Sequence, residues 1–215
     1  DPDQWVAIVT GRGSVAFSSG NDLKAHAVHG PARYPSTGFG GLTRRFNLDK
    51  PIIAAVNGVA LGGGFELVLA CDLALGSTNA SFGLPEPRLG LAALEGGLLR
   101  LPRELSLKQA MGLILTGRRM QAAEALAMGL LNEVTAPQDL MHCARTWAAS
   151  ILECGPLSIR ASKQVVMRGL GEASLSDAFK AQAGCPAVAA LRGSQDFAEG
   201  PLAFAEKRQT TWRGR

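Results

Sequence analysis

A run of three glycines between an apolar strand and an apolar helix constrains this chain more than any other feature of its sequence. Residues 52–56, I-I-A-A-V, are typical of a buried strand, and an apolar helical pattern covers residues 65–70. The glycines at 62–64 lie between them, although a glycine inside a helix or strand costs about 0.5–1 kcal/mol relative to alanine. Either they make a tight turn with close helix packing, or they let a ligand approach the free N–H groups of a helix N-terminus. In the second case Glu66, in the first helical turn, can act on the group that is held there.

The composition is that of one folded domain, or of one domain with a small appendage. The chain has 215 residues, of which 47% are hydrophobic, and no apolar run reaches the roughly 18–20 residues that span a bilayer. The net charge of +4 suits a phosphate-bearing small ligand as well as it suits nucleic acid, and the aromatic interleaving of a nucleic-acid groove is missing. The four cysteines and three histidines lack metal-ligand spacing, so we expect no metal and a reducing compartment.

The beginning of the chain contains a glycine motif that needs a separate interpretation. Residues 5–10 are already a central-strand pattern, so we expect the domain's first N-terminal elements to be missing. Residues 11–16, G-R-G-S-V-A, match a dinucleotide-binding pattern, but turn-forming residues follow where a helix should begin, and the acid expected about 20 residues later is absent. We therefore predict a short hairpin-like excursion that ends at residues 20–22, G-N-D, whose exposed N–H groups can supply an oxyanion donor. Residues 23–41 are predicted to be a surface loop, and a short helix is expected over residues 39–48.

Strand and helix patterns alternate as far as residue 135, and helices dominate after it. The predicted strands after the glycines are 71–76, 79–83 and 131–135, and the predicted helices are 94–100, 105–115, 121–128, 137–153, 156–168 and 174–191. Pro186 should divide or kink the last of these, and Ser194 should cap a final helix that runs through Phe204. We predict an α/β core over residues 1–135 and a helical region over residues 136–215. The helical region either forms an oligomer surface or folds back on its own core.

Three segments in series resemble the crotonase (enoyl-CoA hydratase/isomerase) superfamily. They are residues 11–24, G-R-G-S-V-A-F-S-S-G-N-D-L-K, residues 50–72, which contain the three glycines, and residues 80–86, A-S-F-G-L-P-E. The resemblance extends over the whole chain and is strongest to enoyl-CoA hydratases and carnitinyl-CoA dehydratases. It implies a crotonase-like spiral of β-β-α repeats over residues 1–135, followed by a C-terminal helical trimerisation region over residues 136–215.

The resemblance also implies an enzyme that adds or removes water across the 2,3 bond of an acyl-CoA thioester. The backbone N–H groups of Asn21 and Gly63 would form the oxyanion hole, and Glu66 and Glu86 would be the acid/base pair. Taken alone, Glu86 on a proline-containing loop would be interpreted as a solvated charge. Its match to the family motif makes it a candidate catalytic residue.

Further site residues follow from the same resemblance, which also covers a tail motif, F-A-E-K-R, at residues 204–208. The candidate substrate-binding residues are Asp22, Leu23, Gly62, Pro85 and Leu94, and the candidate CoA-binding residues are Lys24, Phe204 and Lys207. The chain departs from the family pattern at Ala93-Leu94, where a Pro-Gly or Pro-Asp pair is usual, and Leu94 is expected to make that wall of the pocket more apolar.

Several alternatives remain open at this point. Another crotonase-fold activity on acyl-CoA (carnitinyl-CoA dehydratase, enoyl-CoA isomerase or thioester hydrolase) and a weakly catalytic CoA- or RNA-binding relative both fit the motifs. We expect an acyl-CoA or enoyl-CoA ligand, a homotrimer or dimer of trimers, no membrane partner and no nucleic acid. We expect no cofactor, since coenzyme A is part of the substrate. The expected compartment is the cytoplasm, with the mitochondrion as the alternative.

Overall fold

The computed structural model describes residues 1, 3–30 and 32–215 in two compact units. The sheet unit comprises Ile8–Asn47 and Ile52–Thr146, and the helical unit comprises Asp1–Ala7, Leu48–Pro51 and Trp147–Arg215. Pro31, within the predicted loop, lies outside the described residues. Among the described residues, none of the helices combines the length and the apolar character needed to cross a membrane.

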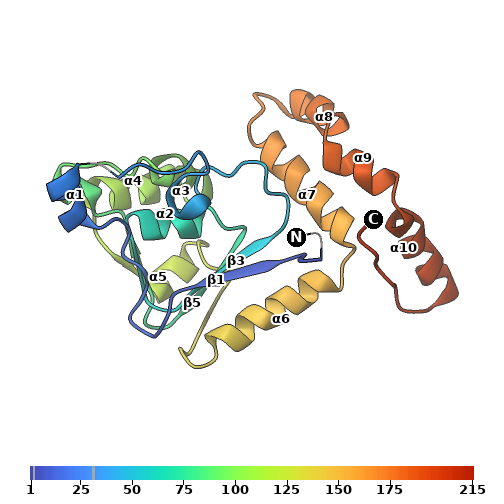
Figure 1. The fold of residues 1–215 in the computed structure, drawn as a ribbon, viewed down its shortest axis with the longest axis horizontal. Helices are drawn as coiled ribbons and strands as arrows, with labels where there is room; N and C mark the ends of the chain where they lie inside the picture. Colours follow the sequence, from blue (N-terminus) through green and yellow to red (C-terminus); the bar gives the residue numbers. More distant parts are fainter. Residues whose placement is uncertain (2, 31) are drawn as a thin grey trace. The chain divides into compact units, whose positions relative to one another are not determined.

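Two four-stranded sheets organise the sheet unit (Figure 1). The first contains, in spatial order, β1 (Ala7–Thr10), β3 (Ile52–Val56), β5 (Leu73–Ser77) and β8 (Glu133–Thr135). The second contains β2 (Ala16–Ser18), β4 (Val59–Leu61), β6 (Ser81–Gly83) and β7 (Met120–Gln121). In the second sheet β2, β4 and β6 are parallel, and β7 is antiparallel to β6.

The first six strands alternate between the two sheets. The chain passes from β3 to β4 and from β5 to β6, so each repeat contributes one strand to each sheet before the next helix begins. Asn57 lies at the break between β3 and β4, where its side chain accepts the Gly11 N–H at 2.9 Å and donates to the carbonyls of Gly13 at 2.7 Å and Ala16 at 3.2 Å. One amide side chain therefore fixes both strand-to-strand connections against each other.

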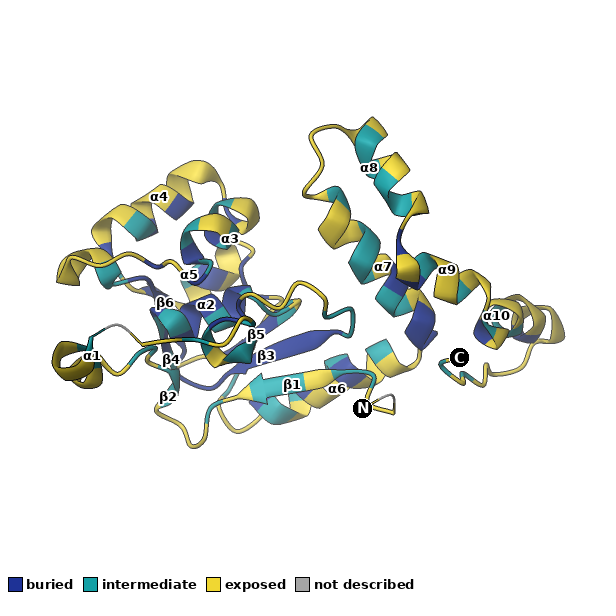
Figure 2. Cartoon of the chain, turned by 45° about the horizontal axis from the view of Figure 1, so that its top comes forward, coloured by how far each residue is buried: buried dark blue, intermediate teal, exposed yellow. Residues whose placement is uncertain are grey.

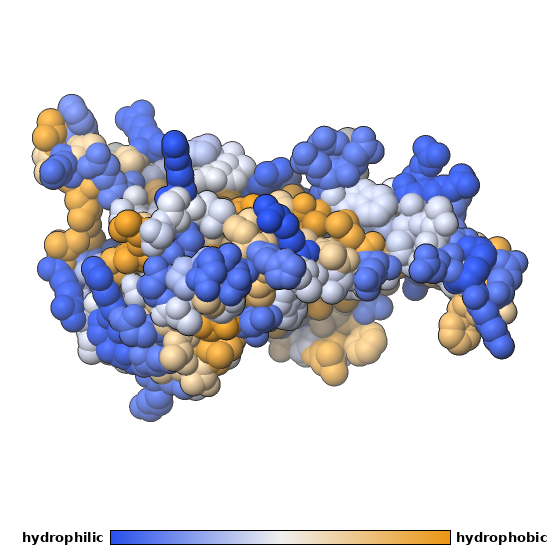
Figure 3. Space-filling view, turned by 90° about the horizontal axis from the view of Figure 1, so that it is seen from below, coloured by the Kyte–Doolittle hydropathy of each residue, from blue (hydrophilic) through white to orange (hydrophobic). Residues whose placement is uncertain are grey.

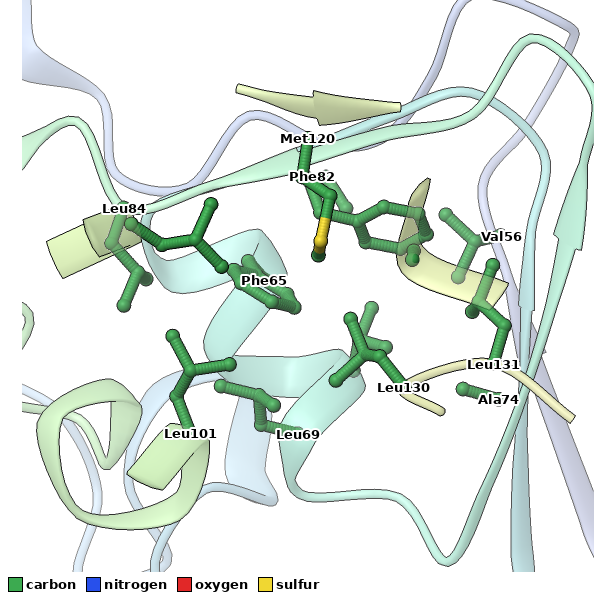
Figure 4. Close-up of a cluster of buried hydrophobic side chains, with 14 of the residues drawn as sticks. Val56, Phe65, Leu69, Ala74, Phe82, Leu84, Leu101, Met120, Leu130 and Leu131 are labelled. Carbon is green, nitrogen blue, oxygen red and sulfur yellow. The ribbon is translucent and has the colours of Figure 1, made fainter. Parts of the chain in front are cut away.

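The helices of the sheet unit enclose an apolar core. They are α1 (Leu23–His29), η1 (Phe39–Gly41, a 3₁₀ turn), α2 (Gly63–Leu69), η2 (Glu86–Leu89, also 3₁₀), α3 (Gly97–Glu104), α4 (Leu107–Thr116) and α5 (Ala122–Ala127). β3 is buried along its whole length (Figure 2). Phe65 of α2 packs against Phe82 of β6 with ring centroids 5.6 Å apart, and Leu84 and Leu101 lie on the other side of Phe65 (Figure 4). Burial of this face fixes the position of α2, whose first turn carries Glu66.

After β8, the regular elements of the described residues are all helices. α6 (Leu140–Leu152) is followed by α7 (Pro156–Gly169), α8 (Leu175–Ala183), α9 (Pro186–Arg192) and α10 (Gln195–Glu206). The predicted division at Pro186 is confirmed, because this proline is the first residue of α9. The predicted cap at Ser194 is confirmed too, since its hydroxyl accepts the Phe197 N–H at 3.1 Å.

Apolar side chains remain exposed on these helices. They include Val166, Met167, Leu170, Leu175, Phe179, Phe197, Leu202 and Phe204. Figure 3 shows one face of the whole chain, on which hydrophobic residues (orange) are exposed among hydrophilic ones (blue).

Four sequence predictions are wrong or incomplete. The excursion after β1 is not hairpin-like, because β2 pairs in parallel with β4. Residues 23–29 form α1 instead of a loop, since the Asp22 carboxylate caps the helix N-terminus. The helix expected over residues 39–48 is a single 3₁₀ turn, because Gly40 and Gly41 have φ of 59° and 70°.

The fourth error concerns the helix expected over residues 94–100. It begins only at Gly97, because the preceding Gly96 has φ 115° and so cannot continue a right-handed helix. The three-residue strand β4 was not predicted from the sequence.

Candidate active site

The candidate site residues lie just beyond the carboxyl ends of three neighbouring parallel strands. Gly20 and Asn21 follow β2, Gly62 and Gly63 follow β4, and Glu86 follows β6. The carboxyl ends of parallel strands lie at one edge of a sheet, where ligands bind in many α/β proteins. The sheet therefore brings together three segments that are far apart in the sequence.

The two predicted oxyanion donors lie on closely packed backbone. A Cβ atom placed on Gly20, which has φ 85°, would lie 2.9 Å from the Gly63 nitrogen and 2.9 Å from the Leu61 carbonyl oxygen. Gly63 is the first residue of α2, so its N–H has no acceptor within the helix. Asn21 is the next residue after Gly20, so its backbone lies beside the same turn.

The three glycines fulfil two different requirements. A Cβ atom on Gly64 would lie 2.0 Å from the Ser18 carbonyl oxygen, so this glycine lets α2 pack directly on the end of β2. Gly62 has φ 55° and ψ −127°, and its Cβ atom would lie 2.8 Å from Oε1 of Glu86. Close packing thus explains Gly64, while Gly62 lies against a candidate catalytic carboxylate.

Glu66 is buried, with 3% of its surface exposed. Its Oε1 accepts the N–H of Gly97 at 2.9 Å. Burial raises the pKa of Glu66, the Gly97 hydrogen bond opposes that shift, and the nearby charge of Glu86 adds to it. Glu66 is therefore held in one orientation and binds a proton more readily than a free glutamate.

Glu86 begins the 3₁₀ turn η2 after β6. Burial raises the pKa of Glu86 as well. Its Oε2 is buried and has no hydrogen-bond partner among the described residues. Since leaving a buried polar oxygen unsatisfied costs free energy, this atom is suited to bind a water or substrate group.

Two aromatic side chains border the site, and the sequence analysis did not single them out. The ring of Phe39 lies over Gly63, because a Cβ atom there would be 3.0–3.2 Å from three ring atoms. The ring of Tyr34 stands edge-on to Phe39, with centroids 5.6 Å apart and an interplanar angle of 88°. The side-chain amide of Asn21 donates a hydrogen bond to the Tyr34 hydroxyl. The only sequence signal was that Tyr34 is the single tyrosine of the chain.

The whole chain, residues 1–215, matches the family described as enoyl-CoA hydratase/isomerase. The chain belongs to the enoyl-CoA hydratase/isomerase family. This confirms the resemblance and the α/β crotonase-like fold that the sequence predicted. It also agrees with the two sheets, because the β-β-α repeat implied by the resemblance gives each sheet one strand per repeat.

The named relatives include both dehydratases and hydratases. The chain is 46% identical over 220 residues to a carnitinyl-CoA dehydratase of Escherichia coli K12, covering 100% of this chain and 84% of that protein. It is 45% identical to the carnitinyl-CoA dehydratase of Proteus mirabilis HI4320, with the same coverage. Its fold is similar to the crystal structure of enoyl-CoA hydratase EchA1 from Mycobacterium marinum, with a TM-score of 0.92, 40% identity and coverage of 100% and 83% of the two chains.

Three of the remaining predicted residues in the sheet unit, Asp22, Leu23 and Pro85, lie at the starts of helical segments. Asp22 caps α1 by accepting the N–H groups of Lys24 at 2.9 Å and Ala25 at 3.0 Å. Pro85 directly precedes η2. Leu23 is exposed at the start of α1, and Leu94 is 71% exposed. At the departure from the family pattern it is Ala93 that is buried, with its side chain against Gly97.

The two predicted CoA contacts near the C-terminus belong to the helical unit. Phe204 lies near the end of α10 with 87% of its surface exposed, and Lys207 ends the helix with φ 54°. Their role in binding CoA remains a prediction. Throughout the described residues, there is no cluster of three or more His, Cys, Asp or Glu side chains suited to a metal ion.

Proposed function

We propose that the chain is a hydro-lyase that adds water to, or removes water from, the 2,3 bond of an acyl-CoA thioester. The observation that carries this proposal is a pair of carboxyl groups, the buried Glu66 in the first turn of α2 and the half-buried Glu86 against Gly62. The hydratases and dehydratases to which the chain is similar support the same reaction type.

Hydration proceeds with one ionised and one protonated carboxyl group. The ionised carboxylate accepts a proton from a bound water, whose oxygen forms a bond to C3 of the 2-enoyl thioester. The carbon–carbon double bond opens toward C2, and negative charge develops on the thioester oxygen. The N–H groups of Asn21 and Gly63 stabilise that charge, a contribution worth about 100- to 1000-fold in rate per donor in other enzymes. The protonated carboxyl group gives its proton to C2, and dehydration follows the same path in reverse.

The raised pKa values of Glu66 and Glu86 are consistent with one carboxyl group acting as acid and the other as base. Burial raises the pKa of both Glu66 and Glu86, and the negative charge of Glu86 raises that of Glu66 further. A carboxyl group with a raised pKa holds its proton more readily, and hydration starts from a state with one proton on the pair. That state is the one that both directions of the reaction require.

The direct test is a screen of 2-enoyl-CoAs that follows loss of the absorbance of the conjugated thioester. Glu66→Gln and Glu86→Gln should each lower kcat by about 100- to 10,000-fold, the usual contribution of a general acid or base. Binding of CoA should persist in both variants, because neither change removes a predicted CoA contact. Full activity in both variants would contradict the assignment.

A quaternary ammonium acyl group is a second candidate for the substrate. The named relatives at 46% identity are carnitinyl-CoA dehydratases, and the Tyr34–Phe39 pair provides aromatic faces beside the site. Aromatic rings attract such cations. The screen should therefore compare crotonyl-CoA with crotonobetainyl-CoA, and a higher kcat/KM for the second would select this substrate.

The proposal includes a homotrimer or a dimer of trimers, built through the exposed apolar side chains of α7 to α10. Light scattering after size-exclusion chromatography would measure the assembly. The carnitinyl-CoA dehydratases to which the chain is similar come from bacteria, so the bacterial cytoplasm is the compartment that fits, and the mitochondrial alternative finds no support among them. No cofactor beyond the CoA of the substrate is included, so prolonged dialysis against a chelator should leave activity unchanged.

A further inference from the structure

Glu95 is a buried acid that has no part in the proposed proton transfers. It precedes α3 and is 9% exposed. Its carboxylate accepts three hydrogen bonds, and all three come from residues 39–44. The Phe39 N–H donates to Oε2 at 3.1 Å, the hydroxyl of Thr43 donates to Oε2 at 2.9 Å, and Arg44 donates to Oε1 at 2.6 Å. One side chain thus fixes a segment that is more than fifty residues earlier in the sequence.

The segment fixed by Glu95 begins at Phe39, one of the two aromatic residues that border the site, and Tyr34 lies before it in the sequence. Phe39 lies over Gly63, one predicted oxyanion donor, and Tyr34 stands edge-on to Phe39. The Tyr34 hydroxyl accepts a hydrogen bond from the side chain of Asn21, the other predicted donor residue. We call Tyr34 and Phe39 the aromatic wall. It contacts both residues between which the thioester oxygen is proposed to bind.

The backbone beside Glu95 contacts the catalytic machinery from the other side. Gly97, two residues later, donates its N–H to Glu66. Burial is the largest cause of the raised pKa of Glu66 and of Tyr34; the charge of Glu95 adds to both shifts, while a hydrogen bond from the Glu95 backbone lowers the pKa of Glu66. Residues 95–97 therefore contact both parts of the site. The Gly97 N–H binds the Glu66 carboxylate, and the Glu95 carboxylate binds the backbone of Phe39 in the aromatic wall.

We propose that Glu95 is a positioning residue that holds the aromatic wall against the oxyanion-hole backbone and so determines which acyl groups the site accepts. This inference rests on the proposed function, since it assigns the acyl side of that same site. Among the hydrogen bonds of the described residues, Glu95 holds the backbone of Phe39, while Tyr34 is held by the Phe39 ring and by the hydrogen bond from Asn21. When the carboxylate is removed, the wall loses its fixed distance from Gly63, and acyl groups of different size are no longer distinguished.

The two oxygens of Glu95 have different partners, so their effects can be tested separately. We call the two hydrogen bonds from Phe39 and Thr43 to Oε2 the tether, and the contact of Oε1 with Arg44 is the ion pair. Oε2 accepts both bonds from the buried side, and Oε1 pairs with Arg44, whose side chain is 54% exposed. Glu95→Gln can keep an acceptor at the Oε2 position and loses only the ion pair. Arg44→Gln removes the same ion pair from the other partner and is the matched control. Glu95→Ala removes the tether and the ion pair together.

The experiment measures kcat/KM for 2-enoyl-CoAs of increasing chain length, and the affinity of saturated acyl-CoAs and free CoA by calorimetry. Glu95→Ala should lower kcat/KM for the preferred substrate by about 100-fold, as a misplacement of about 1 Å does elsewhere. The ratio between short and long acyl groups should move toward one, while the affinity for free CoA stays unchanged. Glu95→Gln and Arg44→Gln should stay within about 3-fold of wild type, as expected for a partly exposed ion pair.

The outcomes separate the two proposals. An unchanged acyl ratio in Glu95→Ala overturns this inference, even if the wild type turns over enoyl-CoAs. Absence of turnover in the wild type, with acyl-CoA selectivity that Glu95→Ala abolishes, supports the inference and removes the proposed function instead. Phe39→Leu keeps Glu95 and changes only the wall, so it should shift the acyl ratio even if Glu95→Ala fails to fold. An unaltered ratio in Phe39→Leu also overturns the inference.

Discussion

Replacing Gly62 by alanine should separate activity from stability. The new Cβ atom would lie 2.8 Å from Oε1 of Glu86 and 3.6 Å from its Cδ. Non-bonded heavy atoms prefer a separation of about 3.5 Å, so the carboxylate oxygen has to retreat by roughly 0.7 Å. The contact is with the far end of a flexible side chain, which can move without disturbing the backbone.

Two magnitudes follow from this geometry. Because a shift of about 1 Å in a catalytic group costs on the order of 100-fold, we expect kcat to fall about 10- to 100-fold. The backbone of Gly62, with φ 55° and ψ −127°, is unfavourable for alanine, and strain of this kind costs about 1–3 kcal/mol of the free energy of unfolding. The variant should therefore fold and bind acyl-CoA but react slowly.

The assay is hydration of the best 2-enoyl-CoA, followed by absorbance, with thermal unfolding measured on the same samples. Gly129→Ala is the control, since Gly129 also has positive φ (83°) and no atom within 4 Å of the added Cβ. Wild-type kcat in Gly62→Ala would refute the placement of Glu86 in the working site. An equal loss of activity in both variants would show that activity follows stability alone.

The other predictions concern stability. Burial raises the pKa of Glu66 above its ordinary value of 4.5, so its stabilising contribution is present below that value and is lost as the pH rises through the raised pKa. Glu66→Gln, which never ionises, should therefore be more stable than wild type at about pH 8, with a gain that disappears toward about pH 4; equal urea midpoints at both pH values would contradict this. Gly64→Ala places a Cβ atom 2.0 Å from the Ser18 oxygen, so it should lower the free energy of unfolding by about 3 kcal/mol or more. In contrast, Gly112 lies inside α4 with open space around it, so Gly112→Ala should raise the free energy of unfolding by about 0.5–1 kcal/mol. Chemical denaturation of both variants measures these changes, and a stabilised Gly64→Ala or a destabilised Gly112→Ala would contradict them.

Sequence patterns predicted the elements whose periodicity is decided by burial. β3 was identified because all five of its residues are buried, and α9 because Pro186 can only begin a helix there. The patterns failed where a single contact decides the conformation. α1 has no buried residue and depends on the Asp22 cap, and β4 is three residues long and is defined by its neighbours on both sides.

The residues of the candidate site also fall into those that the sequence predicted and those that it did not. The two glutamates and the glycine turn were found because their motifs are contiguous in the sequence, although their catalytic roles remain predictions. The hydrogen bonds of Glu95 to residues 39–44 and the aromatic wall of Tyr34 and Phe39 were not predicted, because they depend on contacts between segments more than fifty residues apart. No local pattern distinguishes Glu95 from a surface acid. Only the three hydrogen bonds that converge on it do so.

The parallel pairing of β2, β4 and β6 also determines how the protein reaches its folded state. Ala16 pairs with Val59, and Val59 pairs with Ser81, so each pairing closes a long loop before it gains any contact energy. Folds with such high contact order form slowly. Since one segment of the candidate site follows each of these strands, the site cannot exist in a partly folded chain that lacks any one pairing. Recovery of activity during refolding should consequently coincide with completion of this sheet, and not with the earlier appearance of helices.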